Sequence, residues 1–227
     1  IPTPMALYGE ERANSAGIDL TQAAVRARLA RAVEKLDADG PIVAAPLVGG
    51  VPLLGGAARA GQEMPVTSPV DRSIVVGTVL EATLEDVDAA FESAVAAQWI
   101  WDGRGGVHRG AILRKMADAL EADADRFLAL MAREAGKTFS DGVAEVREAA
   151  DFCRYYAAQA ERELEAPVRL PGPAGETNHL RLKGRGACVC LSPWNLPLAM
   201  FPRQVAAALA PAHAVLPHPA APTPPFP

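Results

Sequence analysis

The chain is 227 residues long, 50% hydrophobic and 22% charged, with a formal net charge of −5. This length supports one or two domains with a substantial core, and the composition excludes wholesale disorder and collagen-like structure. The mild acidity argues against nucleic acid as a partner, and the lack of an apolar run of about 18 residues argues against a transmembrane segment. Aromatic residues make up only 5% and alanine dominates the apolar share, which favours closely packed helices over a β-sandwich.

The first 62 residues read as a lead-in segment with one helix. Residues 1–20 are polar and rich in turn formers, unlike a signal peptide, and the missing initiator methionine indicates a fragment. Residues 21–37 have helical periodicity, with Thr21 as a candidate N-cap. Recurrent glycine and proline from 40 to 69 predict turns and short extended pieces. The apolar stripe of the predicted helix is Val25, Leu29, Val33 and Leu36.

A helical part is predicted from residue 63 to residue 165. It contains a β-branched segment at 73–80, which predicts a strand, followed by Thr83 and Asp86 at the spacing of a capping box. The helix that they open is expected to run to about Gln98. Its apolar residues share one face, namely Val87, Phe91, Ala94 and Val95.

Two longer helices complete this part. One is predicted over about 107–135, with Gly136 as the C′ glycine that ends it, and the other over about 140–163. Their apolar positions recur at helical spacing and are expected to face inward. These positions are Ile112, Met116, Leu120, Phe127, Leu130, Met131, Val143, Val146, Ala150, Cys153 and Tyr156.

The pattern changes after residue 165, where proline and glycine break the helix. Residues 177–182 read as an exposed strand, and residues 187–191 as a short, buried parallel strand. A short helix at about 203–209 and a second strand at 214–216 would begin a βαβ unit. The proline-dense tail beyond is not expected to continue either element.

The densest local signal is Ser192-Pro193-Trp194-Asn195, directly after the predicted parallel strand. Polar groups beyond the carboxyl end of such a strand lie in the crevice where α/β proteins bind ligands. The alternative is an ordinary proline-rich turn, with Trp194 in the core and Asn195 as a turn former.

The three cysteines form no disulfide framework and fit a reduced, cytoplasmic compartment. Cys188 and Cys190 are two residues apart, so both face the same side of the predicted strand. Cys153 lies on the inward stripe of a helix. All three are therefore expected to act as small hydrophobes. Cys188-x-Cys190 lacks the spacing and companion ligands of a zinc site, and the four histidines are scattered, so no metal is expected.

Residues 192–200, SPWNLPLAM, resemble the SPWNFPLA signature of the aldehyde dehydrogenase superfamily. Residues 133–138 resemble the E-x-G-K segment of that family, 145–157 the helix after it, and 65–79 its N-terminal strands. Four segments in the right order extend the resemblance over about 63–224.

The resemblance implies an α/β fold made of the N-terminal part of an aldehyde dehydrogenase. Its helical segment would span 63–165, and an extended arm of the kind used for oligomerisation would span 166–185. Residues 186–227 would be the truncated start of a Rossmann-like, NAD-binding domain.

Residues 6–20 resemble the segment that joins the two catalytic domains of the bacterial bifunctional proline utilization proteins, the PutA family. In that family, a flavin-dependent proline dehydrogenase precedes an enzyme that oxidises L-glutamate γ-semialdehyde (1-pyrroline-5-carboxylate) to glutamate with NAD. The resemblance implies NAD as the cofactor, a small-molecule aldehyde as the substrate and a homo-oligomer. FAD would belong only to a proline dehydrogenase domain that these residues do not include.

The resemblance also assigns site residues. Asn195 corresponds to the asparagine of the signature, whose side-chain amide donates to the oxyanion formed when a cysteine thiolate attacks the aldehyde. Glu148, or alternatively Glu145, would meet the amino group of the substrate. The residues that match the strand end lining the NAD site are Leu191, Ser192, Pro193 and Trp194.

Some positions depart from the family pattern. In the family a lysine and a glutamate bind the adenosine ribose, but here His218 stands in place of the lysine and Ala221 in place of the glutamate. Ala212 and His213 stand where the family has a Gly-Asn turn. A neutral histidine has no fixed positive charge, so weak NAD binding is expected. The nucleophilic cysteine and the water-activating glutamate come later in the family, so the chain alone is expected to be inactive. The alternative is a non-catalytic helical module retained for assembly.

Overall fold

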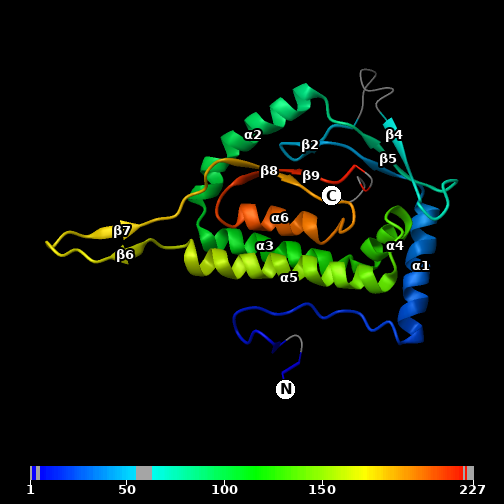
Figure 1. Ribbon diagram of the computed structural model, residues 1–227, viewed down its shortest axis with the longest axis horizontal. Helices are drawn as coiled ribbons and strands as arrows, with labels where there is room; N and C mark the ends of the chain where they lie inside the picture. The colour runs from blue at the N-terminus through cyan, green and yellow to red at the C-terminus, as the bar shows by residue number, and fades with distance from the viewer. Residues whose placement is uncertain (1, 4–5, 55–62, 222, 224–227) are drawn as a thin grey trace.

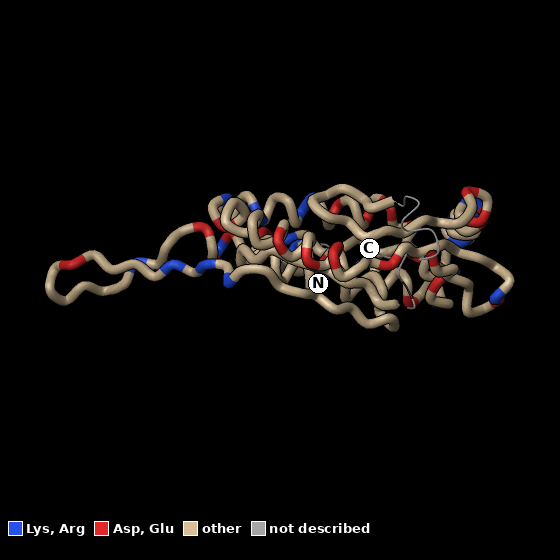
Figure 2. Tube along the Cα trace, turned by 90° about the horizontal axis from the view of Figure 1, so that it is seen from above, with Lys and Arg blue, Asp and Glu red and all other residues tan. Residues whose placement is uncertain are grey.

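The computed structural model describes residues 2–3, 6–54, 63–221 and 223. Within these ranges the chain forms six helices and nine short strands, which confirms the predicted α/β class (Figure 1). Seen from above, the body of the molecule is a flattened slab from which a single hairpin projects (Figure 2).

Helix α1 (Ala23–Asp39) confirms the predicted N-terminal amphipathic helix, and Leu29 on its stripe is fully buried. The predicted N-cap at Thr21 is wrong. The hydroxyl and the N–H of Thr21 both donate to the Asp19 carboxylate, at 2.7 and 3.0 Å, so Thr21 belongs to a turn ahead of the helix. The helix begins only after Gln22, whose side chain makes no capping hydrogen bond.

A small three-stranded sheet and a separate hairpin follow α1. In the sheet, β1 runs parallel and β4 antiparallel to the central strand β5, which confirms the strand predicted there. The predicted turns and short extended pieces are present in the described residues, and the part at 55–62 lies outside them. The strands are β1 (Ile42–Ala44), β4 (Glu63–Thr67) and β5 (Val75–Leu80) in the sheet, with β2 (Leu47–Val48) and β3 (Val51–Pro52) in the hairpin.

Helix α2 (Leu84–Gly103) opens with the predicted capping box. The Thr83 hydroxyl accepts from the Asp86 N–H at 3.2 Å, and the Asp86 carboxylate accepts from the Thr83 N–H at 2.8 Å. The helix continues past its predicted end at Gln98, because no proline or glycine opposes it before Gly103.

Three helices carry most of the core, where two were predicted. The expected helix at 107–135 is divided at Asp123 into α3 (Gly106–Ala122) and α4 (Ala124–Glu134). Asp123 leaves helical geometry, with φ −99° and ψ 15°, and α4 turns away to pack against α1 and against the next helix, α5 (Phe139–Glu163). Helical periodicity does not reveal this break, because both pieces keep the same spacing of apolar residues.

Helix α5 confirms the second predicted helix and packs along α3 through small residues. Gly136, before α5, has a φ of 65°, as expected for the glycine that ends α4. A Cβ at Gly106 would overlap the carbonyl oxygen of Ala160, so glycine permits the close approach of α3 and α5. The alanine-rich composition thus builds closely packed helices. Their fully buried side chains include Leu113, Ala117, Leu128, Met131, Ala149, Ala150, Cys153 and Ala157.

The hairpin after α5 projects from the body of the molecule (Figures 1 and 2). Its strands β6 (Val168–Leu170) and β7 (Asn178–Leu180) pair antiparallel, and every residue of β6 is exposed. The exposed strand predicted at 177–182 is therefore confirmed.

The C-terminal part forms the predicted βαβ unit. Strands β8 (Ala187–Leu191) and β9 (Ala214–His218) are parallel, and α6 (Met200–Leu209) between them in sequence lies on the side of α3 and α5 (Figure 1). The prediction that 187–191 is buried is wrong: Val189 is 62% and Leu191 66% exposed. Cys190, on the opposite face, is buried, so β8 is buried on one face only.

Strand β9 also runs further than expected, through Pro217 to His218. The Ala214 N–H donates to the Gly186 carbonyl, and the His218 carbonyl accepts from the Ser192 N–H. Alternate residues of β9 therefore direct their backbone groups toward β8. The nitrogen of Pro217 consequently lies on the open side of an edge strand, where no donor is required.

Candidate functional site

Six of the seven predicted site residues lie at or just beyond the carboxyl ends of β8 and β9. Leu191 ends β8 and is in register with His218, which ends β9. The Ser192 N–H donates to the carbonyl oxygen of His218 at 3.1 Å. Residues 192–199, which we name the Asn195 loop, then lead into α6. The carboxyl edge of parallel strands is where α/β proteins bind ligands.

The Asn195 loop presents polar and aromatic side chains to the solvent. Asn195 is exposed, and its side-chain amide makes no hydrogen bond within the described part of the chain. Trp194 is 60% exposed, so the alternative interpretation that places it in the core is wrong. An amide N–H that is not engaged by the protein is free to donate to the oxygen of a ligand.

Gln204 on α6 holds the first residues of this loop. Its Nε2 donates to the Leu191 carbonyl at 2.9 Å, and its Oε1 accepts from the Ser192 hydroxyl at 3.1 Å. The sequence interpretation missed Gln204. The available signal was a polar pair, Arg203 and Gln204, in a helical segment whose other residues are apolar.

Glu145 on α5 holds the other end of the loop. Its side chain is 2% exposed, and Oε2 accepts from the N–H groups of Leu198 and Ala199, both at 3.0 Å. Oε1 forms an ion pair with Lys137, which is 16% exposed and belongs to the E-x-G-K segment. Glu145 is thus engaged by the protein, whereas Glu148, three residues further along α5, is exposed and has no hydrogen bond or ion pair within the described residues.

A buried cation at the opposite end of α6 balances this buried anion. Arg109 is 3% exposed, and burial lowers the pKa of its guanidinium. Its Nε donates to the Ala210 carbonyl at 2.9 Å, and Nη1 donates to the Asp102 carbonyl at 3.2 Å. An anion at the N-terminus and a cation at the C-terminus both match the dipole of α6. Charged groups from outside therefore fix the helix that follows the Asn195 loop at both ends.

A second carboxyl group from the E-x-G-K segment is buried without a partner. Glu134 is 3% exposed, and neither of its oxygens has a hydrogen-bond partner in the described ranges. Burial raises its pKa to about 8, so the carboxyl group stays protonated near neutral pH.

Two of the three cysteines lack the environment of a nucleophile. All three are free; burial raises the pKa of Cys153 to about 12 and also raises that of Cys190. A nucleophilic cysteine requires a lowered pKa. The interpretation of Cys153 and Cys190 as small buried hydrophobes is therefore confirmed.

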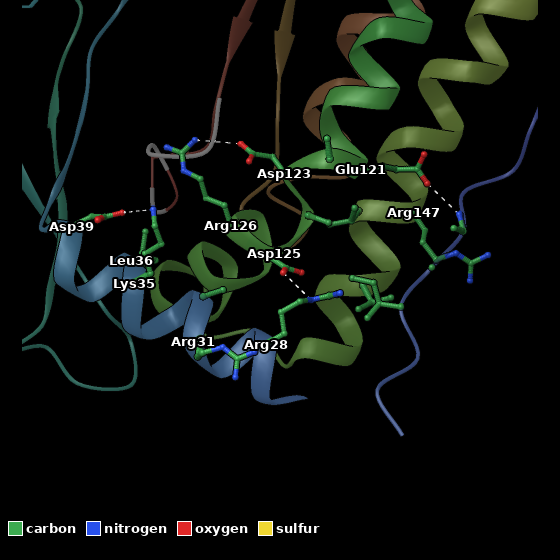
Figure 3. A pocket seen from close by; sticks show the side chains of 18 residues that line it. Arg28, Arg31, Lys35, Leu36, Asp39, Glu121, Asp123, Asp125, Arg126 and Arg147 are labelled. Carbon is green, nitrogen blue, oxygen red and sulfur yellow. Dashed lines mark hydrogen bonds and ion pairs between the residues drawn. The ribbon is translucent and has the colours of Figure 1, made fainter. Parts of the chain in front are cut away.

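A groove lies elsewhere, between α1, the segment before it and the junction of α3 and α4 (Figure 3). It has a volume of about 660 Å³, and none of the predicted site residues lines it. Charged side chains pair along it, Arg28 with Asp125 at 2.9 Å and Lys35 with Asp39 at 3.1 Å.

The described residues contain no group of three or more His, Cys, Asp or Glu side chains able to hold a metal ion. None of the helices in these ranges is both long and apolar enough to cross a bilayer.

The geometry defines an α/β protein with a polar loop at the carboxyl edge of parallel strands. A family model described as the aldehyde dehydrogenase family matches residues 57–226, so the chain belongs to that family. The bifunctional protein PutA of Escherichia coli (strain K12) is 41% identical over 229 residues, which cover 99% of this chain and 16% of the relative. The 1-pyrroline-5-carboxylate dehydrogenase of Geobacillus thermodenitrificans (strain NG80-2) is 32% identical over 208 residues, which cover 91% of this chain and 39% of the relative.

Solved structures show the same relationship. The crystal structure of PutA from Bdellovibrio bacteriovorus matches with a TM-score of 0.87 and 29% identity, covering 98% of this chain and 22% of that one. The 1-pyrroline-5-carboxylate dehydrogenase from Thermus with bound NAD matches with a TM-score of 0.86 and 26% identity, covering 92% and 40%. The predicted family and fold are confirmed, and the chain spans only about a sixth of the length of the PutA relative.

Proposed function

We propose that this chain supplies the N-terminal part of an NAD-dependent dehydrogenase that oxidises L-glutamate γ-semialdehyde to L-glutamate in proline catabolism. The observation that carries the proposal is the Asn195 loop, which lies at the carboxyl end of β8 with both of its ends anchored and its amide exposed. The names of the similar proteins, PutA and 1-pyrroline-5-carboxylate dehydrogenase, support the substrate class.

The proposed role of Asn195 is to stabilise negative charge. When a thiolate attacks the aldehyde carbon, the carbonyl oxygen becomes an oxyanion, and the Asn195 amide N–H donates to it. One such donor stabilises the transition state by about 3–4 kcal/mol when water is excluded. The thiolate is not supplied by Cys153 or Cys190, whose pKa values are raised. We propose that these 227 residues alone do not oxidise the aldehyde.

The carboxylate proposed to meet the amino group of the substrate is Glu148. It is exposed on α5, whereas Glu145, the alternative, is occupied by the backbone of the Asn195 loop and by Lys137. An exposed carboxylate without an internal partner can pair with an ammonium group of a ligand.

The proposed domain boundaries are a lead-in segment to residue 62 and a helical part over 63–165, followed by the arm and the start of the NAD-binding domain.

The carboxyl end of β8 offers contact surface for NAD, whereas the positions proposed to meet the adenosine ribose do not. Leu191 and Trp194 are exposed and offer apolar and aromatic surface beside the accessible backbone of Ser192 and Pro193. Bound NAD would supply the hydride acceptor. On the adenosine side, His218 and Ala221 are exposed and provide neither a fixed positive charge nor a carboxylate for the ribose. We therefore propose that this chain binds NAD weakly.

Calorimetric titration with NAD tests this proposal. We expect weak heat for the parent chain and at least about tenfold tighter binding for the double variant His218→Lys, Ala221→Glu, since two charged hydrogen bonds are restored. The matched control places the same residue types on the projecting hairpin, as His179→Lys with Ala174→Glu, and is expected to bind like the parent. Equal affinity in all three proteins, or no heat in any, contradicts the proposed NAD site.

A second candidate function is assembly, and the projecting hairpin favours it. Val168, Leu170 and Leu180 are 56%, 41% and 50% exposed on an arm that stands away from the body (Figure 2). Exposed apolar side chains on such an arm suit contact with a second copy of the chain. We expect Leu170→Glu to lower the apparent mass in light scattering after size-exclusion chromatography, without changing the circular dichroism spectrum. A parent chain that is already monomeric contradicts this function.

A further inference from the structure

The two anchors of the Asn195 loop differ in chemistry. At the first anchor, the neutral side chain of Gln204 and a backbone hydrogen bond hold Leu191 and Ser192. At the second, the charged carboxylate of Glu145 accepts from two consecutive N–H groups, those of Leu198 and Ala199. Hydrogen bonds to charged groups are stronger than neutral ones, so the second anchor has more control over the loop.

The second anchor depends on Lys137 as well. Glu145 is 2% exposed, and a buried carboxylate without a partner is strongly unfavourable. The Lys137 ammonium pairs with Oε1, while Oε2 accepts from the two backbone N–H groups. Lys137 follows α4 directly and Glu145 lies on α5, so the pair transmits the position of the helical core to a loop about fifty residues further along the chain.

We propose that Lys137 and Glu145 are positioning residues that act through the backbone of Leu198 and Ala199 to set where the Asn195 amide lies. This inference rests on the proposed function of Asn195. Only two residues separate Asn195 from Leu198, so a displacement of the anchored N–H groups is passed to the Asn195 side chain with little room for compensation. A misplaced oxyanion donor loses much of its effect, because catalysis requires it to be in position before the reaction.

An ordinary structural role would give a different result from a positioning role. A salt bridge that only stabilises the core would, when removed, loosen α5 and α6 throughout. A positioning pair would release the loop and leave the rest of α6 in place, since Arg109 and Trp101 hold its far end through the carbonyls of Ala210 and Leu209. The indole N–H of Trp101 donates to the Leu209 carbonyl at 2.9 Å and therefore reports on that far end.

The experiment is NMR of the ¹⁵N-labelled chain as parent, Glu145→Gln, Lys137→Met and the double variant. Three readouts are followed: amide exchange at Leu198 and Ala199, the side-chain signals of Trp194 and Asn195, and the indole signal of Trp101. The matched control is Glu163→Gln, which alters a carboxylate on the same helix that is 56% exposed. Lys137→Arg, which keeps the charge, serves as the conservative variant.

We expect exchange at Leu198 and Ala199 to accelerate about tenfold or more in both single variants, with shifted Trp194 and Asn195 signals and an unchanged Trp101 signal. The double variant should resemble each single variant, because the pair acts as a unit. Lys137→Arg and the control should resemble the parent. If Glu145→Gln does not fold, Glu145→Asp, which keeps the charge but withdraws it by one methylene, carries the same test.

Two results overturn the inference. In one, the Trp194 and Asn195 signals stay unchanged while Leu198 and Ala199 lose protection, so the anchor does not control the loop. In the other, Trp101 and the core amides of α5 lose protection to the same extent as the loop, so the pair is only structural. The experiment contains no NAD, so it is independent of the calorimetric test. Failure of that titration with a correctly anchored loop counts against the proposed function alone.

Discussion

Glu134, in the last turn of α4, should make the chain less stable as the pH rises. Its carboxyl group is 3% exposed and has no partner within the described residues, and burial raises its pKa from 4.5 to about 8. The unfolded chain therefore releases this proton near pH 4.5 and the folded chain only near pH 8. Below the lower value both states hold the proton and there is no penalty. Above it, each pH unit lowers the free energy of unfolding by about 1.4 kcal/mol, until the folded state also titrates.

Glu134→Gln keeps the shape of the protonated acid and removes the titration. At pH 7 the penalty spans about 2.5 pH units, so we expect the variant to be more stable than the parent by about 3 kcal/mol, and at pH 5 by less than about 1 kcal/mol. Urea denaturation followed by circular dichroism at both pH values measures the difference. Glu163→Gln, on an exposed carboxylate, should change stability equally little at either pH. A gain for Glu134→Gln that is the same at pH 5 and pH 7 would contradict a raised pKa of the Glu134 carboxyl group.

Two further substitutions test the packing around the site. Arg109→Met removes a buried cation that donates to carbonyls at the ends of α2 and α6. It should lower the free energy of unfolding, measured by urea denaturation, by about 3 kcal/mol. A loss below about 1 kcal/mol would contradict the role of Arg109 in holding the end of α6. Gly106→Ala places a Cβ against the Ala160 carbonyl and should cost about 2 kcal/mol. Gly103→Ala, where a Cβ would meet nothing within 4 Å, is its control, and equal effects of the two would show that α3 and α5 are not in close contact at Gly106.

Local patterns predicted the elements well where the local chemistry is strong. The capping box at Thr83 and Asp86 and the glycine at 136 both occur as expected, because each depends on groups within a few residues of one another. The division of the helix at Asp123 was not predictable, since the apolar spacing continues across it. The Thr21 cap failed for a different reason, because the Asp19 carboxylate accepts from the same hydroxyl.

The candidate site was predictable in part. The signature around Asn195 and the strand before it placed five residues at the end of β8, and the parallel pairing of β8 and β9 brings Leu191 and His218 side by side. The roles of Glu145 and Glu148 could not be separated from sequence. They lie three residues apart on one helix, and only the return of the chain at Leu198 buries the first and leaves the second exposed.

The family, most of the helices and the loop that carries Asn195 follow from the sequence alone, because they depend on short motifs and on the periodicity of apolar residues. Which charges are buried, and which backbone groups they hold, depends instead on how distant segments pack together. Glu145 and Arg109 each acquire a partner from a segment 53 to 101 residues away, and no local pattern encodes such contacts. The same holds for the exposed face of β8, since burial of a strand depends on what packs against it and not on its own apolar residues.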